Sequence, residues 1–177
     1  MLLILLGGGA ASAQPGGKGV VVTERTRAEL LVHAPEGVEP GIPVWIGLQL
    51  AHQPDWHSYW KNSGDSGLPT KLEWKLPIGV LAGDIAWPMP RKYPIGTLIN
   101  YGYEDTVLLP VPLTITPEFK PPLLGGTLEV KLKAQWLVCA KVCIPEDGEF
   151  TLAIPVRSAT GLHGPYFQAS FAAQPKA

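Results

Sequence analysis

Two cysteines, Cys139 and Cys143, are the residues of this chain whose type and spacing are best suited to chemistry. They are the only cysteines in 177 residues, and they lie close together in the chain. Such sulfurs form either one small disulfide or one reactive dithiol. A disulfide that closes so short a loop removes little entropy from the unfolded chain and stabilises a fold weakly. Closely spaced pairs are more typical of sites that alternate between oxidised and reduced forms.

The residues alone leave two other roles open for this pair. One is a passive clip across a loop, in a non-catalytic binding or chaperone-like domain with a structural disulfide. The other is a metal site, such as that of a copper-handling protein that binds through Cys139, Cys143 and His57. The metal site is the weaker alternative, because two thiolates need further ligands and the chain has only 2 Met and 4 His. We therefore predict no metal and no cofactor.

The backbone between the two cysteines must turn. A disulfide requires Cα atoms roughly 4.4–6.8 Å apart, whereas residues four apart on a strand are separated by about 13 Å. The geometry predicts either one helical turn or a tight hairpin loop over residues 140–142. Pro145 follows directly and would end a helix there.

Short strands separated by turns are predicted to carry this pair. The chain has 20 Gly and 19 Pro spread among apolar runs, which favours strands over long helices. Pro110 and Pro112 predict an edge strand or a bulge in their run, since proline cannot donate to a ladder. The runs together fit an all-β sandwich; they cover residues 20–23, 28–33, 44–50, 70–76, 107–115, 127–138 and 150–156.

Two segments lack a sustained hydrophobic period. Residues 79–103 combine three prolines with Trp87 and several tyrosines, and we predict a long irregular loop packed by these aromatic rings. Ordered loops of that length are often functional. The tail at 158–177 is predicted to be a short amphipathic helix or a linker.

The start of the chain and its charge set the expected compartment and partners. Residues 1–13 resemble a secretory signal peptide that ends in Ala11-Ser12-Ala13, but the positive charges expected at its start are missing, so we predict an incomplete signal. Such a chain is exported to an oxidising compartment. The net charge of −1, with acidic and basic residues mixed, disfavours nucleic-acid binding. We expect a monomer.

A second cluster is specific enough to support a family resemblance. It reads Asp55-Trp56-His57-Ser58-Tyr59-Trp60-Lys61-Asn62-Ser63-Gly64-Asp65-Ser66-Gly67. Further segments follow in order: Trp87-Pro88-Met89-Pro90, Asn100-Tyr101-Gly102-Tyr103-Glu104, the run 107–115, and Trp136 to Glu146 with both cysteines. This ordered set resembles the N-terminal periplasmic domain of the DsbD and ScsB family of thiol:disulfide interchange proteins.

The resemblance implies an immunoglobulin-like sandwich over residues 14–157, located in the periplasm. It implies that the cysteine pair accepts electrons from a membrane reductant through a thioredoxin-like domain or protein. The acceptors would be periplasmic disulfide proteins such as an isomerase. The chain also lacks the membrane and thioredoxin-like domains of full-length members, so it is expected to be a stand-alone module or a piece of a longer protein.

The resemblance also implies roles for single residues. Cys143 would form the mixed disulfide with a partner, and Cys139 would resolve it. Candidate shielding residues around the pair are His57, Tyr59, Tyr101 and Tyr103. The spacing of the cysteines is shorter than in better-known DsbD domains, so the choice of substrate cannot be transferred.

Overall fold

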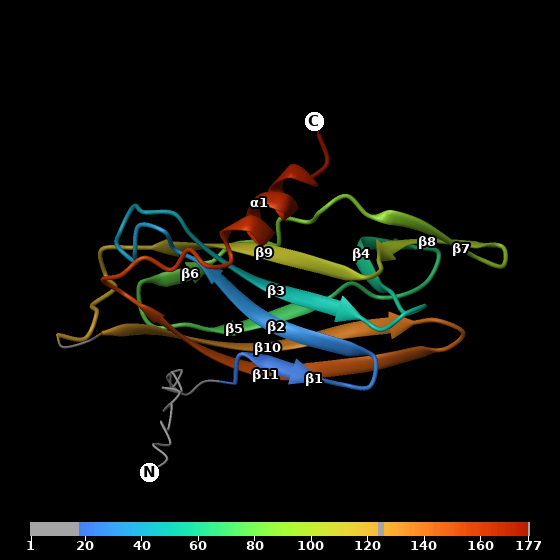
Figure 1. The fold of residues 1–177 in the computed structure, drawn as a ribbon, viewed down its shortest axis with the longest axis horizontal. Coiled ribbons are helices and arrows are strands. Elements are labelled where there is room, and N and C mark those ends of the chain that lie inside the picture. Colours follow the sequence, from blue (N-terminus) through green and yellow to red (C-terminus); the bar gives the residue numbers. More distant parts are fainter. Residues whose placement is uncertain (1–17, 124–125, 177) are drawn as a thin grey trace, which may run out of the picture.

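The computed structural model describes residues 18–123 and 126–176, and Figure 1 shows their fold. The predicted signal peptide at 1–13 lies outside the described residues. In chain order the elements are β1 (Val20–Val22), β2 (Thr26–His33), β3 (Val44–His52), β4 (Ser58–Gly64), β5 (Lys71–Lys75), β6 (Val80–Ala82), β7 (Arg91–Ile95), β8 (Leu98–Tyr103), β9 (Thr106–Ile115), β10 (Thr127–Cys139), β11 (Cys143–Pro155) and α1 (Gly164–Ala172). Every run that the sequence predicts as a strand is a strand in the structure.

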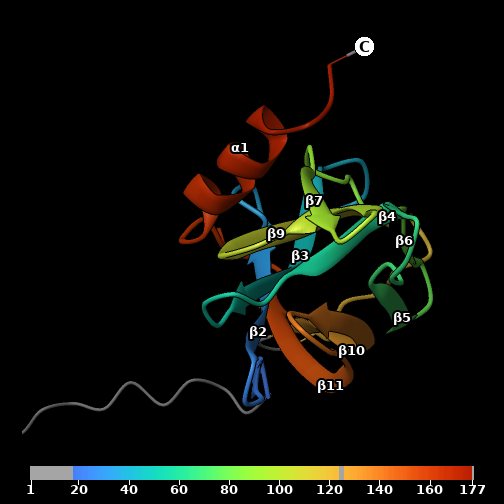
Figure 2. The ribbon, with the colours of Figure 1, turned by 90° about the vertical axis from the view of Figure 1, so that its right-hand side faces the viewer.

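Two of the sheets lie face to face as the layers of a sandwich (Figure 2). The larger has five strands in the order β1-β2-β3-β9-β6, and the other has three strands in the order β11-β10-β5. All pairings in both sheets are antiparallel. A third sheet, β4-β8-β7, lies toward one end of the molecule (Figure 1). The predicted immunoglobulin-like β-sandwich is thereby confirmed.

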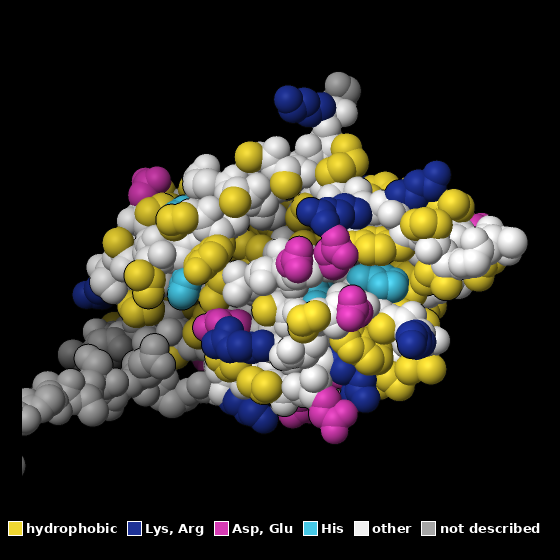
Figure 3. Space-filling view, turned by 45° about the vertical axis from the view of Figure 1, so that its right-hand side comes forward, with side chains coloured by type: hydrophobic (Ala, Val, Ile, Leu, Met, Phe, Trp, Pro, Cys, Tyr) yellow, Lys and Arg dark blue, Asp and Glu magenta, His cyan; other side chains and the backbone are white. Residues whose placement is uncertain are grey.

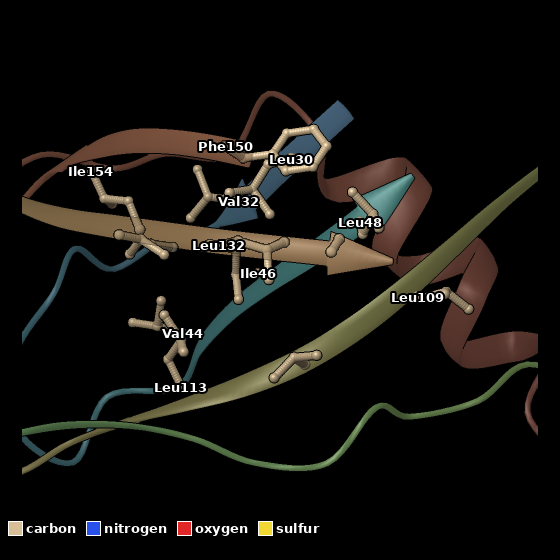
Figure 4. Close-up of a cluster of buried hydrophobic side chains, with 14 of the residues drawn as sticks. Leu30, Val32, Val44, Ile46, Leu48, Leu109, Leu113, Leu132, Phe150 and Ile154 are labelled. Atoms are coloured by element: carbon tan, nitrogen blue, oxygen red, sulfur yellow. The ribbon is translucent and has the colours of Figure 1, made fainter. Parts of the chain in front are cut away.

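The core lies between the two layers. Figure 4 shows Leu30 and Ile46 of the larger sheet meeting Leu132 and Phe150 of the smaller one, and all four side chains are buried. Strand β10 alternates buried and exposed residues along almost its whole length, as a strand with one face on a core must. This long strand holds its C-terminal residue, Cys139, in a fixed position relative to the core.

The segment predicted to be one irregular loop, 79–103, is irregular only at 83–90. It begins with β6 and ends with the β7–β8 hairpin. The sequence did not predict strand β7, because Tyr93 is its one partly buried residue and the strand therefore shows no alternation of apolar and polar residues. Pro94 also argues against a strand, but β7 is the outer strand of its sheet, where a missing N–H is tolerated.

The C-terminal segment forms a helix that packs on the larger sheet. The ring of Phe167 is fully buried in a small cluster with Leu31 and Leu108. The hydroxyl of Ser170 donates a hydrogen bond of 3.1 Å to the carbonyl of Leu108. Of the two forms that the sequence left open for this tail, the helix is the one observed. Within residues 18–123 and 126–176, no helix is long and apolar enough to cross a membrane.

Candidate redox site

The two cysteines face each other at the end of the β10–β11 hairpin. Cys139 and Cys143 are paired in the antiparallel register, their Cα atoms lie 4.1 Å apart, and a disulfide joins their sulfurs. The turn between them is closed by a hydrogen bond of 3.0 Å from the N–H of Ala140 to the carbonyl of Val142. Of the two conformations open to the sequence, the hairpin is therefore the one adopted.

The two sulfur-bearing residues differ in exposure. Cys139 is 1% exposed, whereas Cys143 and the preceding turn residues Lys141 and Val142 are exposed. A sulfur of another molecule can approach Cys143 from solvent, but the body of the domain covers Cys139. Figure 3 brings this end of the molecule forward and shows acidic and basic side chains interspersed with apolar ones.

Cys139 is buried because β10 continues into a contact with the segment that enters β4. The N–H of His57 donates to the carbonyl of Cys139 at 3.1 Å, and the N–H of Cys139 donates to the carbonyl of His57 at 3.0 Å. His57, in the cluster that begins at Asp55, is thus held against the first cysteine by backbone hydrogen bonds.

Tyr59 reaches the other sulfur. Its ring is 1% exposed, and its hydroxyl oxygen lies 3.9 Å from Sγ of Cys143. Burial raises the pKa of Tyr59, so the hydroxyl stays protonated and can donate a hydrogen bond to sulfur. The structure therefore brings two of the four candidate shielding residues, His57 and Tyr59, to the cysteine pair.

His57 lies in a tyrosine environment. Its ring stacks on that of Tyr93 at a centroid distance of 4.6 Å and 6° between planes, and it meets the edge of Tyr59 at 5.2 Å. Burial lowers the pKa of His57, and nearby Glu104 opposes this effect to a smaller extent. Its Nε2 atom is buried without a hydrogen-bond partner in the described part of the chain. The imidazole is therefore neutral at neutral pH.

Sequence reasoning missed Tyr93 as a residue of this site. Tyr93 is paired with Asn100 of β8, two positions before Gly102, which is paired with Tyr59. Side chains alternate along a strand, so Tyr93 and Tyr59 share one face of the small sheet. Burial raises the pKa of Tyr93 to about 12. The segment 79–103 did contain a signal, since its aromatic residues were predicted to pack, but the strand register decides which of them faces the site.

The same register directs Tyr101 and Tyr103 elsewhere. Both flank Gly102 and therefore project from the opposite face of β8. The ring of Tyr101 meets the edge of Trp60 at 6.5 Å. The hydroxyl of Tyr103 donates a hydrogen bond of 2.8 Å to the carbonyl of Pro88, and its ring belongs to the main core. These contacts of Tyr101 and Tyr103 are with the body of the domain and not with the cysteine pair.

A glycine turn supports the ring of Tyr59. Gly67 has a φ of 93°, in the left-handed region, and a Cβ at this position would lie 2.3 Å from Cε1 of Tyr59. Glycine is required both for the backbone conformation and for the close approach of the ring. The chain bends at Asp65 and Ser66, between Gly64 and Gly67, in a segment whose residue types are typical of turns.

The comparisons with known proteins agree with this geometry. The family model of the thiol:disulfide interchange protein DsbD, N-terminal, matches residues 29–155. The crystal structure of the N-terminal periplasmic domain of ScsB from Proteus mirabilis superposes with a TM-score of 0.65 and 18% identity, over 90% of this chain and 59% of that chain. At this identity the likeness shows the fold. This chain therefore spans less than two thirds of that ScsB domain.

Two further comparisons add nothing to the argument. A crystal structure of the yeast GGA1 GAE domain covers 77% of this chain and 96% of its own, but its TM-score of 0.37 and identity of 11% are too low to support a conclusion. None of the curated proteins compared matches the chain.

The family match covers most of the chain, both cysteines and the β4 segment that contacts them. The chain therefore belongs to the DsbD N-terminal domain family of thiol:disulfide interchange proteins.

Proposed function

We propose that this domain exchanges thiols and disulfides through Cys139 and Cys143, as a relay that carries electrons in the periplasm. The observation that best supports this is the asymmetry of the pair. The exposed sulfur of Cys143 is open to attack, and the buried sulfur of Cys139 lies across the hairpin as its internal partner. A disulfide that only clipped the loop would not need one accessible sulfur.

The reaction consists of two exchange steps in each direction. A donor thiolate attacks Sγ of Cys143, the bond to Cys139 breaks, and Cys139 leaves as a thiolate that takes a proton from solvent. The donor's second thiolate then attacks its own sulfur in the mixed disulfide and releases Cys143. Two electrons pass from the donor, which becomes a disulfide, to the domain, which becomes a dithiol. Transfer to an acceptor disulfide is the reverse sequence, with Cys143 attacking and Cys139 resolving.

The surroundings of the pair are suited to these steps. The hydroxyl of Tyr59 can donate a hydrogen bond to a Cys143 thiolate, which stabilises it as attacking or leaving group. The backbone of His57 is paired with that of Cys139, and the ring of Tyr93 stacks on the ring of His57. These two rings would keep solvent oxidants from Cys139 while a partner engages Cys143.

The partners follow from the family. The donor would be a thioredoxin-like domain or protein that is supplied by a membrane electron-transfer protein, and the acceptor a periplasmic disulfide isomerase or another thiol-redox protein. The periplasmic location is supported by the ScsB domain, which is described as periplasmic. The domain would act as a monomer, and exchange between sulfurs requires no cofactor.

Replacement of one cysteine tests the proposal. Cys139→Ala should accumulate a mixed disulfide through Cys143 with a dithiol protein such as a thioredoxin, because the resolving sulfur is gone. Cys143→Ala should accumulate far less, because Cys139 is buried. If neither variant captures a partner, and the native pair stays oxidised in strongly reducing glutathione buffer, the disulfide is a structural clip and the domain is a binding module.

A further inference from the structure

We infer that Glu146 is a positioning residue for exchange at Cys139 and Cys143. Its buried carboxylate holds the base of the cysteine hairpin, so that the two sulfurs remain opposed after the disulfide has opened. This inference rests on the proposed thiol-disulfide function. It adds that Glu146 affects how readily the disulfide between Cys139 and Cys143 forms again.

Glu146 is a carboxylate in an enclosed position. Its side chain is 5% exposed, although it follows Cys143 by only three positions. Its Oε2 atom accepts hydrogen bonds from the hydroxyl of Thr23 at 2.8 Å and from Nε1 of Trp136 at 3.1 Å. Its Oε1 atom lies 3.6 Å from a guanidinium nitrogen of Arg25. A buried charge is costly unless it is hydrogen-bonded and paired. Here Oε2 is hydrogen-bonded, whereas the buried Oε1 has no hydrogen-bond partner among the described residues and lies near the charge of Arg25.

These contacts join three parts of the fold at the base of the hairpin. Glu146 is paired in the ladder with Trp136, so its carboxylate binds the strand that ends in Cys139 as well as its own. Thr23 belongs to the turn between β1 and β2. That turn is itself closed, because Thr23 Oγ1 accepts from the N–H of Thr26 at 2.9 Å. The hairpin is thereby fastened to the larger sheet.

Arg25 extends the network to the other side of the site. Its guanidinium lies over the ring of Trp56, 5.1 Å from the ring centroid. Trp56 directly precedes His57, whose backbone is bonded to that of Cys139. Glu146 is therefore linked to Cys143 along its own strand and to Cys139 through Arg25 and the segment before β4. No other described carboxylate makes this set of contacts.

The network contacts both strands of the hairpin, and it restrains the distance between the sulfurs once the disulfide is open. The disulfide is the last cross-strand link of the hairpin, and once it breaks only the strand ladder and this network keep the sulfurs together. Two groups held in the right geometry react as if at a high local concentration. By restraining both strands, Glu146 would favour ring closure, which shifts the thiol-disulfide equilibrium toward the disulfide and speeds resolution of a mixed disulfide at Cys143.

Glu146→Gln tests this inference, with Glu149→Gln as the matched control. The glutamine side chain has one oxygen and one NH₂ group in place of the two carboxylate oxygens. The NH₂ group would face either Arg25 or the two hydrogen-bond donors at the Oε2 position, so at least one contact of Glu146 is lost. Glu149 lies on the same strand but is exposed. We expect Glu146→Gln to lower the equilibrium constant for oxidation by glutathione about tenfold, which is about 30 mV in potential. The lifetime of a glutathione mixed disulfide at Cys143 should lengthen, and Glu149→Gln should change neither by more than about twofold.

The stability of the two redox forms separates positioning from a merely structural role. If Glu146 acts on ring closure, its replacement must destabilise the oxidised domain more than the reduced one, by the same factor as the change in the oxidation equilibrium. Equal loss in both forms, with an unchanged equilibrium constant, would overturn the inference. Thr23→Val keeps the shape of the side chain and removes its hydrogen bond to Glu146, together with the hydroxyl contacts that close the β1–β2 turn. It should shift the equilibrium in the same direction by about threefold if Glu146→Gln does not fold.

The native domain distinguishes failure of this inference from failure of the proposed function. A reversible glutathione transition in the native domain, with Glu146→Gln and Thr23→Val both unchanged, would remove the inference and leave the function intact. A native pair that never opens would overturn both.

Discussion

The backbones of His57 and Cys139 are joined by two reciprocal hydrogen bonds of 3.1 and 3.0 Å. The two residues are 82 positions apart in the sequence, yet these bonds continue the ladder of β10 into the entry of β4. Through them the aromatic cluster of β4 lies beside the cysteine hairpin. A change in the small sheet β4-β8-β7 is therefore expected to affect the redox pair.

The hydroxyl of Tyr59 is predicted to promote formation of the Cys143 thiolate. Tyr59→Phe keeps the ring in its place and removes the hydroxyl that lies 3.9 Å from the sulfur. We expect the alkylation rate of Cys143 in the reduced domain to fall about threefold, the effect of one modest hydrogen bond. Tyr101→Phe, on the other face of β8, is the control and should leave the rate unchanged. Equal rates in all three proteins would show that the hydroxyl has no such role.

Tyr93 is predicted to keep the imidazole of His57 out of water. Tyr93→Ala removes the stacked ring and should lower the free energy of unfolding by about 1–2 kcal/mol through lost burial and stacking. It should also raise the pKa of His57 toward its ordinary value, because desolvation is the main cause of the depression. An NMR titration of the imidazole measures this shift. The corresponding change at the exposed Tyr166 is the control, and an unmoved titration would contradict the assignment.

Two histidines, the buried His57 and the partly buried His52, predict a loss of stability on mild acidification. Burial lowers the pKa of both His52 and His57 below the ordinary value of 6.5. The unfolded chain therefore binds more protons than the native domain as pH falls through 6.5, and the native state is progressively disfavoured. We expect the free energy of unfolding to decrease between pH 7.5 and 5.5, because the unfolded chain takes up protons that the two histidines of the native domain do not.

Denaturant unfolding at the two pH values measures this effect. His57→Gln should show a smaller decrease than the native domain, because one of the titrating groups is gone. A decrease that is the same with and without His57 would assign the pH dependence to other groups.

Gly67 is predicted to be intolerant of a side chain. Gly67→Ala adds a Cβ in the left-handed region, where it would lie 2.3 Å from the ring of Tyr59. We expect a loss of more than about 2 kcal/mol in the free energy of unfolding, from backbone strain and from displacement of the ring. Gly96 also has a positive φ, but a Cβ at this position would meet nothing within 4 Å. Gly96→Ala should therefore lower the free energy of unfolding by only about 1 kcal/mol. Equal losses would show that the contact with Tyr59 is unimportant.

The sandwich was predictable because its strands carry their own signal. Strand β10 alternates apolar and polar residues, and this pattern arises directly from one buried and one solvated face. The small sheet carried no such signal. Strand β4 ends in a polar run, and β7 has one partly buried residue, so neither strand has a hydrophobic pattern that predicts it.

The irregular stretch 83–90 has a physical cause that the sequence did contain. The carbonyls of Pro112 and Pro110 accept hydrogen bonds from the N–H groups of Gly83 and Ala86. Pro110 and Pro112 have no N–H group to donate on that side of β9. A neighbouring segment can therefore donate hydrogen bonds to their carbonyls but receives none in return. The predicted edge character of this strand is thus seen locally, although β9 lies inside its sheet.

The site was predictable in part. The short spacing of the cysteines required a turn, and the family resemblance placed His57 and Tyr59 beside them. The choice among Tyr93, Tyr101 and Tyr103 depended on the register of β8 against β4 and β7, in which Gly102 is opposite Tyr59 and Asn100 is opposite Tyr93. A register one residue away would exchange the two faces of β8, and the order of residues does not reveal which register forms.

The position of the disulfide at the very end of the β10–β11 ladder also bears on how partners tell the two redox forms apart. The strand pairing runs from Thr127 opposite Pro155 to Cys139 opposite Cys143, so opening the last link leaves every earlier pair in place. We therefore expect the oxidised and reduced domains to have nearly the same shape. A partner that reads shape alone binds both forms equally, and equal binding drives no reaction. If the domain relays electrons as proposed, we therefore expect the direction of flow to depend on the sulfur chemistry of donor and acceptor, and not on selective docking.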